Sequence, residues 1–164
     1  NDAIAKLNFF KENENTTIVR RLPTPQNNKN IKLKPNGKYY ALLIGNSIYD
    51  YKERWKDLVS PKNDIKQIKA ILDKSYKFEK IITVIDGNKK EILNGFKELS
   101  KLSTDNDYVL IYYAGHGDIK YEQAYWIPKD GTEWINDDWI MFEYPLLPFS
   151  NIELDFLGWF MLAS

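Results

Sequence analysis

Apolar residues recur along the middle of the chain with two different periods. Apolar-rich runs at 39–44, 79–85 and 108–113 predict buried strands, because a strand covered on both faces carries apolar side chains on both. Residues 63–74 and 89–102 place apolar side chains at helical spacing, which predicts two amphipathic helices. Strands and helices that alternate in this way form right-handed crossovers. We therefore predict an α/β fold with a mainly parallel sheet and helices on both faces.

Turn residues set the expected limits of these elements. Ser60-Pro61 and Asn63-Asp64 supply a rigid turn, a capping side chain and an acid near the positive end of the first helix. The run Asp86-Gly87-Asn88 ends the second strand. Residues 131–164 show no clean period. For this tail we expect a loop, followed by a helix or strand from Leu154 onward.

The first 37 residues differ from the rest of the chain. They are rich in Asn and Lys and contain Pro23, Pro25 and Pro35, with little apolar surface to bury. The chain has 164 residues, which suits one domain of ordinary size. We predict an N-terminal extension or linker over 1–37 and one domain over 38–164.

Composition excludes several classes of function. Lys+Arg and Asp+Glu are 23 each, so no excess positive charge is present for generic nucleic-acid binding. Cysteine is absent and histidine occurs once, which excludes disulfides, a cysteine nucleophile and a multi-histidine metal site within these residues. No apolar run approaches the roughly 20 residues of a membrane span. We expect no cofactor or metal, since no glycine-rich phosphate loop follows the first strand and no acids are spaced as in a calcium loop. The sequence does not assign the protein to a cellular compartment.

His116 is the first candidate for chemistry. It follows the third predicted strand and lies between Gly115 and Gly117, which let the backbone turn sharply beside a substrate. An imidazole has an unperturbed pKa near 6.5 and can exchange protons at neutral pH, and the Gly117 N–H could face a developing oxyanion. A turn histidine of purely structural use explains the same pattern.

Asp64 is the second candidate. As a carboxylate near a helix start it could simply favour the helix dipole, or it could face the cleft and bind a cationic substrate side chain. A serine hydrolase that pairs Ser47 or Ser60 with His116 is a further alternative. It is disfavoured because the chain has no G-x-S-x-G elbow.

Four segments in order resemble the caspase-like cysteine peptidases. The segment from Tyr40 to Tyr49 resembles their first strand, and Leu58 to Asp64 resembles the opening of their first helix. Tyr112 to Gly117 is similar to the histidine motif of the metacaspase and paracaspase branch, and Ala124 to Asp130 to the strand and turn that follow it. The resemblance covers about residues 38–130.

The resemblance implies a three-layer caspase–haemoglobinase fold and peptide-bond hydrolysis by a Cys–His dyad. In that scheme His116 is the base and general acid, and the Gly117 N–H contributes to the oxyanion hole. Asp64 matches a position that lines the primary specificity pocket in paracaspases, which implies peptide or protein substrates cleaved after Arg or Lys.

The chain departs from the family at the nucleophile. In the family, a cysteine in a D-x-C type motif ends the next core strand, and this chain has no cysteine. One explanation is an incomplete domain that lacks the nucleophile strand. The other is a pseudoenzyme that binds or regulates, with a homodimer through its aromatic-rich tail as one form to test. Under either explanation, we expect this polypeptide alone to be inactive.

Overall fold

Four parallel strands form the central sheet of the protein, whose computed structural model describes residues 36–134, 137–149 and 153–161, the last as backbone. The strands are β1 (Tyr39–Gly45), β2 (Phe78–Ile85), β3 (Tyr108–Gly115) and β7 (Glu153–Met161). Their order across the sheet is β2-β1-β3-β7, and each neighbouring pair is parallel. The α/β class predicted from the sequence is confirmed.

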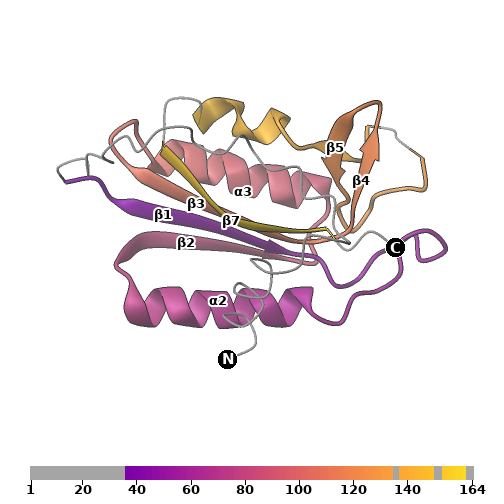
Figure 1. Ribbon diagram of the computed structural model, residues 1–164, viewed down its shortest axis with the longest axis horizontal. Coiled ribbons are helices and arrows are strands. Elements are labelled where there is room, and N and C mark those ends of the chain that lie inside the picture. The colour runs from indigo at the N-terminus through magenta and orange to yellow at the C-terminus, as the bar shows by residue number, and fades with distance from the viewer. Residues whose placement is uncertain (1–35, 135–136, 150–152, 162–164) are drawn as a thin grey trace, which may run out of the picture. The chain divides into compact units, whose positions relative to one another are not determined.

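Two helices connect the first three strands. Helix α2 (Pro61–Ser75) joins β1 to β2, and α3 (Lys89–Leu102) joins β2 to β3. Figure 1 shows α2 on one face of the sheet, with α3 and the short 3₁₀ helix η1 (Tyr144–Phe149) on the other. This arrangement is a three-layer sandwich, and the first three strands and both helices lie where the hydrophobic pattern predicts them.

The period of two along β1 and β3 divides the core between the layers. On the α2 side, Ala41, Leu43 and Tyr112 pack with Ile65. On the α3 side, the cluster is larger and includes aromatic rings. Alternate side chains of a strand point to opposite faces, so both strands must be apolar throughout. All eight residues of β3 are buried.

The start of α2 differs from the expected one. The helix begins at Pro61, two residues before the predicted start, and Ser60 is its N-cap residue without a side-chain cap bond. Asn63 therefore lies inside the first turn and is not the cap. The Lys62 N–H is instead bound by the Ser47 hydroxyl at 3.0 Å. Proline suits this first position because it has no N–H to leave unpaired.

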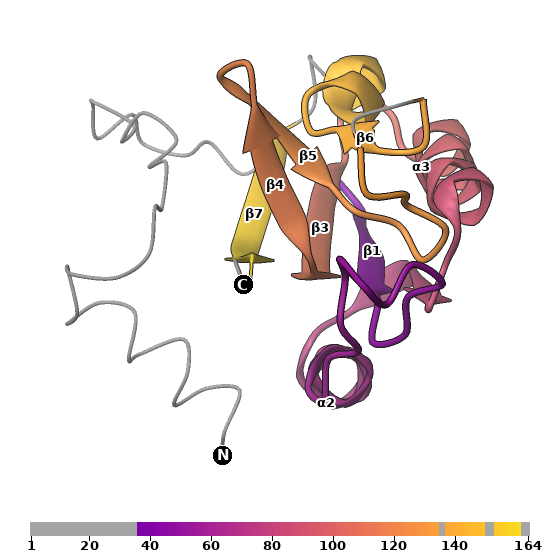
Figure 2. The same ribbon diagram turned by 90° about the vertical axis from the view of Figure 1, so that its right-hand side faces the viewer.

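A second, antiparallel sheet follows β3 in the chain. It contains β4 (Gly117–Lys120), β5 (Gln123–Trp126) and β6 (Ile140–Met141), in that order across the sheet. Figure 2 shows this small sheet beyond the ends of β3 and β1. The tail after residue 130, to which the sequence assigned no clear elements, thus contains β6 and η1. From Leu154 onward, where we expected a helix or a strand, it forms the strand β7.

The β4–β5 hairpin turns through two residues in a strained conformation. Tyr121 and Glu122 have φ of 50° and 63°, between the paired Lys120 and Gln123. Two-residue hairpin loops of this type favour Asn-Gly. Because Tyr121 is 86% exposed, replacing the pair by Asn-Gly is expected to raise the free energy of unfolding by about 1 kcal/mol. Urea denaturation tests this, and an unchanged or lower midpoint would contradict it.

Two further structural observations bear on the class of protein. Across the ranges that the structure describes, no helix has the length and apolar character needed to cross a bilayer. In the same ranges, no three His, Cys, Asp or Glu side chains are gathered closely enough to hold a metal ion. The predicted extension over 1–37 falls almost wholly outside the described residues, so the domain boundary at residue 38 stays a prediction.

Candidate active site

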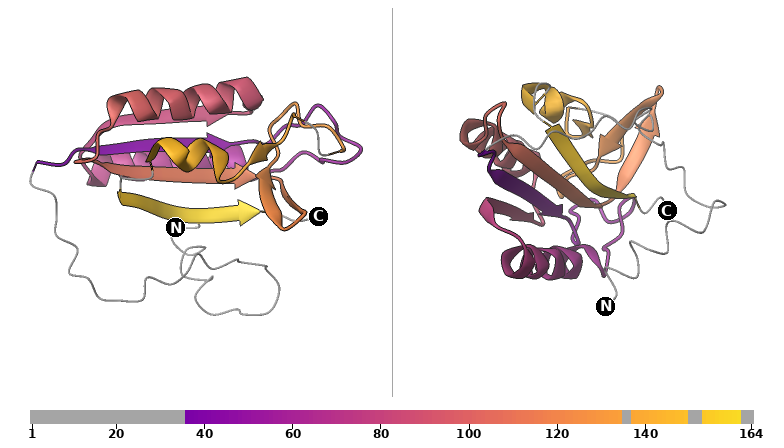
Figure 3. Two further views of the ribbon diagram at one scale, coloured as in Figure 1. Left: turned by 90° about the horizontal axis from the view of Figure 1, so that it is seen from above. Right: turned by 60° about the vertical axis from the view of Figure 1, so that its left-hand side comes forward.

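The carboxyl ends of the parallel strands meet at one edge of the sheet. The loop after β1 (residues 46–60), the start of α2 and the turn after β3 all lie at this edge (Figure 1). The view from above shows the loop and the turn together beyond the strand ends (Figure 3). In open α/β sheets, this is the edge where ligands bind. His116 follows β3 directly, and Asp64 lies in the first turn of α2. The topology therefore places both predicted site residues at the same edge.

The imidazole of His116 is buried and held by the loop after β1. Its exposed fraction is 3%, and Nε2 lies 2.8 Å from the Lys56 carbonyl oxygen. A carbonyl oxygen can only accept, so in the neutral imidazole this contact puts the proton on Nε2 and leaves the lone pair on Nδ1. The rings of Tyr49 and Trp55 lie against the imidazole, at centroid distances of 4.8 and 5.5 Å. This arrangement orients Nδ1 as the basic atom.

Two tyrosine hydroxyls bind the main chain of His116. Its N–H donates to the Tyr49 hydroxyl at 2.7 Å. The Tyr113 hydroxyl shares its one proton between the His116 carbonyl, at 2.7 Å, and the Ile127 carbonyl, at 3.0 Å. Burial raises the pKa of Tyr49 to about 12 and raises that of Tyr113 well above its usual value, so both hydroxyls stay protonated near neutral pH. Both can therefore donate as well as accept.

Gly117 begins β4 with its N–H directed away from β5. Lys120 and Gln123 flank the two-residue turn and form a hydrogen-bonded pair, and such pairs alternate along an antiparallel ladder. The bond from Ile127 N–H to the His116 carbonyl, at 3.0 Å, fits this alternation. The Gly117–Trp126 pair is then of the non-hydrogen-bonded kind. The Gly117 N–H therefore makes no ladder bond to β5.

Asp64 is partly buried and lies close to β3. Its negative charge, together with the larger effect of burial, raises the pKa of the Tyr112 hydroxyl. Tyr112 belongs to the face of β3 that packs on α2, whereas Tyr113 belongs to the opposite face. Asp64 therefore stands at the α2 side of the edge that carries His116.

Ser47 takes no part in a catalytic pair in this structure. Its hydroxyl accepts from the Lys62 N–H at the start of α2, and its own N–H donates to Asp86 at 2.7 Å. Ser47 thus links the loop after β1 to the start of α2 and to the loop after β2. These contacts do not favour the serine-hydrolase alternative.

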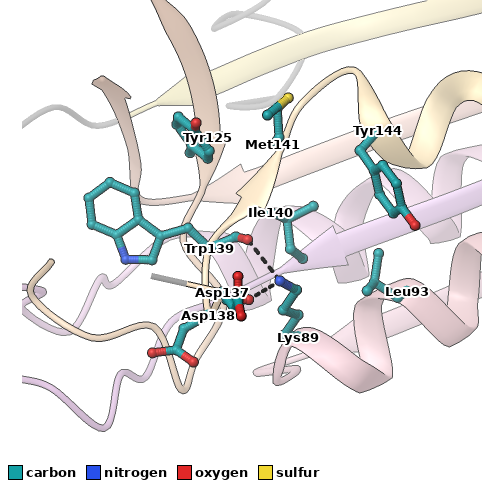
Figure 4. Close-up of a pocket in the computed structure, with 9 residues that line it drawn as sticks. All are labelled: Lys89, Leu93, Tyr125, Asp137, Asp138, Trp139, Ile140, Met141 and Tyr144. Atoms are coloured by element: carbon teal, nitrogen blue, oxygen red, sulfur yellow. Dashed lines mark hydrogen bonds between the residues drawn. The ribbon is translucent and has the colours of Figure 1, made fainter. Parts of the chain in front are cut away.

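A separate cavity lies between α3, η1 and the small sheet, with a volume of about 780 Å³. Figure 4 shows the Lys89 ammonium bound to the carbonyl oxygens of Asp137 and Trp139. The Trp139 ring turns to the other side, where it meets Trp55 at a centroid distance of 5.6 Å. Trp139 thus packs against Trp55, whose ring lies against the imidazole.

Several residues around His116 were not singled out by sequence reasoning. Tyr49, Trp55 and the Lys56 carbonyl belong to a polar loop whose pattern resembles an ordinary connection. The carbonyl carries no sequence signal, because every residue has one. For Tyr49 and Trp55, the only signal in the sequence is the high number of aromatic residues in one loop, which favours burial of some of them.

Comparisons with known proteins agree with this fold. A profile of the caspase domain family matches residues 38–144. The human mucosa-associated lymphoid tissue lymphoma translocation protein 1 is 31% identical over 113 residues, which are 68% of this chain and 13% of the human protein. Protein GSU0716 from Geobacter sulfurreducens has a similar fold, with a TM-score of 0.56 and 14% identity over 73% of this chain and 48% of that one.

The fold is a three-layer α/β domain with a buried histidine after the third parallel strand. The chain belongs to the caspase domain family, because the family profile covers more than half of it. It spans a small part of the human relative and about half of the bacterial one.

Proposed function

We propose that this chain is the histidine-bearing part of a caspase-like cysteine endopeptidase of the metacaspase and paracaspase type, which cleaves after Arg or Lys. The observation that carries the proposal is the bond from His116 Nε2 to the Lys56 carbonyl. It holds a buried imidazole in one tautomer with its basic nitrogen defined, which a base in a Cys–His dyad requires.

In the proposed reaction, Nδ1 of His116 takes the proton from a cysteine thiol and the thiolate attacks the peptide carbonyl. The carbonyl oxygen becomes an oxyanion, which the Gly117 N–H stabilises. The imidazolium then returns the proton to the leaving amine, and water hydrolyses the thioester. The thiol is supplied from outside these 164 residues, since the chain has no cysteine.

We assign to Asp64 the choice of the residue before the cleaved bond. Its carboxylate lies at the same edge of the sheet as His116 and is partly buried, where an ion pair with Arg or Lys is less screened than in open solvent. An arginine can bind a carboxylate through two parallel hydrogen bonds, so peptides with Arg are expected to bind better than those with Lys.

Binding of product-like peptides tests this assignment without a nucleophile. The peptide acetyl-Ala-Ala-Ala-Arg is titrated into protein with 15N-labelled histidine, and the same peptide ending in Gln serves as comparison. The Arg peptide is expected to shift the His116 signals. Asp64→Asn is expected to raise its Kd about tenfold or more, because a charge-assisted hydrogen bond is lost.

Asp73 supplies a matched control on the same helix. It lies near the far end of α2, where it pairs with Lys69, and Asp73→Asn is expected to leave the Kd unchanged. Equal binding of the Arg and Gln peptides, or peptide binding that leaves the His116 signals in place, would contradict the proposed specificity site.

A second candidate function is a non-catalytic module that binds or regulates, and the missing cysteine favours it. Incubation of the chain with Arg- and Lys-containing peptides is expected to give no turnover under either function, because an imidazole without a thiolate has nothing to activate. Turnover that His116→Ala abolishes would exclude this second function. Sedimentation tests the homodimer proposed with it.

A further inference from the structure

One hydrogen bond that the hairpin ladder would make at His116 is replaced. His116 and Ile127 face each other just beyond the Gly117–Trp126 pair, at a position where two residues normally exchange two hydrogen bonds. The bond from Ile127 N–H to His116 O is present at 3.0 Å. The reciprocal groups bind elsewhere: His116 N–H donates to the Tyr49 hydroxyl, and Ile127 O accepts from the Tyr113 hydroxyl at 3.0 Å.

Gly115 makes room for this arrangement. A Cβ atom at residue 115 would lie 2.6 Å from the Tyr113 hydroxyl oxygen and 2.8 Å from that of Tyr49, closer than such atoms approach. The glycine before His116 therefore lets two phenol groups reach the backbone. Tyr49 is fully buried, and its hydroxyl also donates to the Asn46 carbonyl at 3.3 Å.

The loop after β1 connects Tyr49 with the group that orients the imidazole. The Tyr49 N–H donates to the Asp57 carboxylate at 3.1 Å, and a hydrogen bond from Lys52 lowers the pKa of that carboxyl. The residue before Asp57 is Lys56, whose carbonyl accepts from His116 Nε2. One loop thus contacts both the main chain and the ring of His116, and a single carboxylate joins the two contact points.

We propose that Tyr49 is a positioning residue for His116: its hydroxyl draws the His116 N–H out of the hairpin ladder and so sets the imidazole against the Lys56 carbonyl. The assignment rests on the proposed function of His116 as the base. Tyr113 supports the same peptide unit from the carbonyl side. Tyr49 differs from Tyr113 because it belongs to the loop that also carries Lys56.

The single histidine of the chain makes the proposal measurable. Protein with 15N-labelled histidine is studied by NMR at pH 8, where the nitrogen signals report the tautomer and the Nε2–H signal reports exchange with water. Tyr49→Phe removes only the hydroxyl. We expect the population of the Nδ1–H tautomer to rise at least threefold and the exchange of Nε2–H to accelerate at least tenfold.

Two controls separate positioning from general loss of stability. Tyr40→Phe removes the hydroxyl of another buried tyrosine, at the opposite end of β1. Ile92→Val removes one methyl group from the core between α3 and the sheet. Both variants are expected to keep the wild-type tautomer and exchange rate.

A second variant covers the case in which Tyr49→Phe does not fold. Asp57 is largely exposed, with a side chain 43% accessible, so Asp57→Ala leaves the core intact while it releases Tyr49 and the neighbouring carbonyl. It is expected to change the His116 signals in the same direction. Wild-type signals in the folded Tyr49→Phe protein, or in Asp57→Ala where Tyr49→Phe does not fold, would overturn the proposal. Equal changes in the two control variants would also overturn it.

These signals require neither peptide nor thiol. A negative result therefore concerns Tyr49 alone, whereas failure of the Arg peptide to bind concerns the proposed function. The two ideas can fail independently.

Discussion

Replacing Trp126 with alanine is expected to lower the free energy of unfolding by about 4 kcal/mol, among the largest effects of a single change in this protein. Trp126 is 1% exposed and stacks on Tyr113 at a centroid distance of 4.8 Å. Phe96 and Phe142 pack around it at 5.7 and 5.5 Å. The indole thus joins β5, β3, α3 and the segment after β6 in one aromatic cluster, and its loss leaves a cavity that four separate elements would have to close.

Trp134 provides the matched control. It is a tryptophan of the same region, but its side chain is 71% exposed, so Trp134→Ala is expected to change the free energy of unfolding by less than about 0.5 kcal/mol. Urea denaturation of the two variants and the wild type measures both effects. A similar loss for the two variants would show that the burial of Trp126 does not carry the expected stability.

Replacing Asn46 with aspartate is expected to cost about 3 kcal/mol at pH 7 and much less at pH 4. Asn46 is fully buried. Its amide donates to the Gly87 carbonyl at 3.1 Å and accepts from the Gly87 N–H at 2.9 Å. These two bonds join the loops after β1 and β2. A carboxylate at this position can still accept, but its second oxygen would face the Gly87 carbonyl.

The free energy of unfolding of Asn46→Asp is expected to fall as the pH rises, because the protonated carboxyl fits this position better than the carboxylate does. A neutral carboxyl can donate to the Gly87 carbonyl and accept from its N–H, as the amide does, so folding favours the protonated acid and raises its pKa above the unfolded value of about 3.9. The variant is therefore closest to wild type below about pH 4. It loses stability as the pH rises through the folded pKa, until the carboxyl is fully ionised.

Urea denaturation of Asn46→Asp and wild type at pH 4 and pH 8 measures this difference. Asn94→Asp is the control, because Asn94 is exposed on α3 and the same change of chemistry there adds a solvated charge. An equal loss at both pH values for Asn46→Asp would show that the two bonds to Gly87 do not carry the effect.

The main elements of the fold could be predicted from the sequence because they depend on local periodicity. The apolar run of β1 buries both faces of a strand, and the helical stripe of α3 buries one face of a helix. Both patterns can be recognised from residues close together in the chain. The position of His116 after a buried strand follows from the same pattern. The tail beyond Asp130 could not be assigned, because η1 contains two prolines and β6 only two residues.

The surroundings of His116 could not be predicted, because they come from segments far apart in the chain. Tyr112 and Tyr113 are adjacent and chemically identical, yet Tyr112 packs toward α2 and Tyr113 toward α3. Ser47 was a candidate nucleophile in the sequence. In the structure, its hydroxyl accepts a hydrogen bond from the N–H of Lys62, fifteen residues away at the start of α2. Such assignments depend on which strand face and which loop meet in space.

The sequence by itself determined the alternating strands and helices, the absence of a thiol and the one imidazole at the end of a buried strand, since each follows from residue types and their spacing. The carbonyl that orients this imidazole and the two phenols that bind its backbone are known only from the folded structure. Hydrogen bonds between distant groups form only after packing has brought the loops together, so they have no periodic trace in the chain.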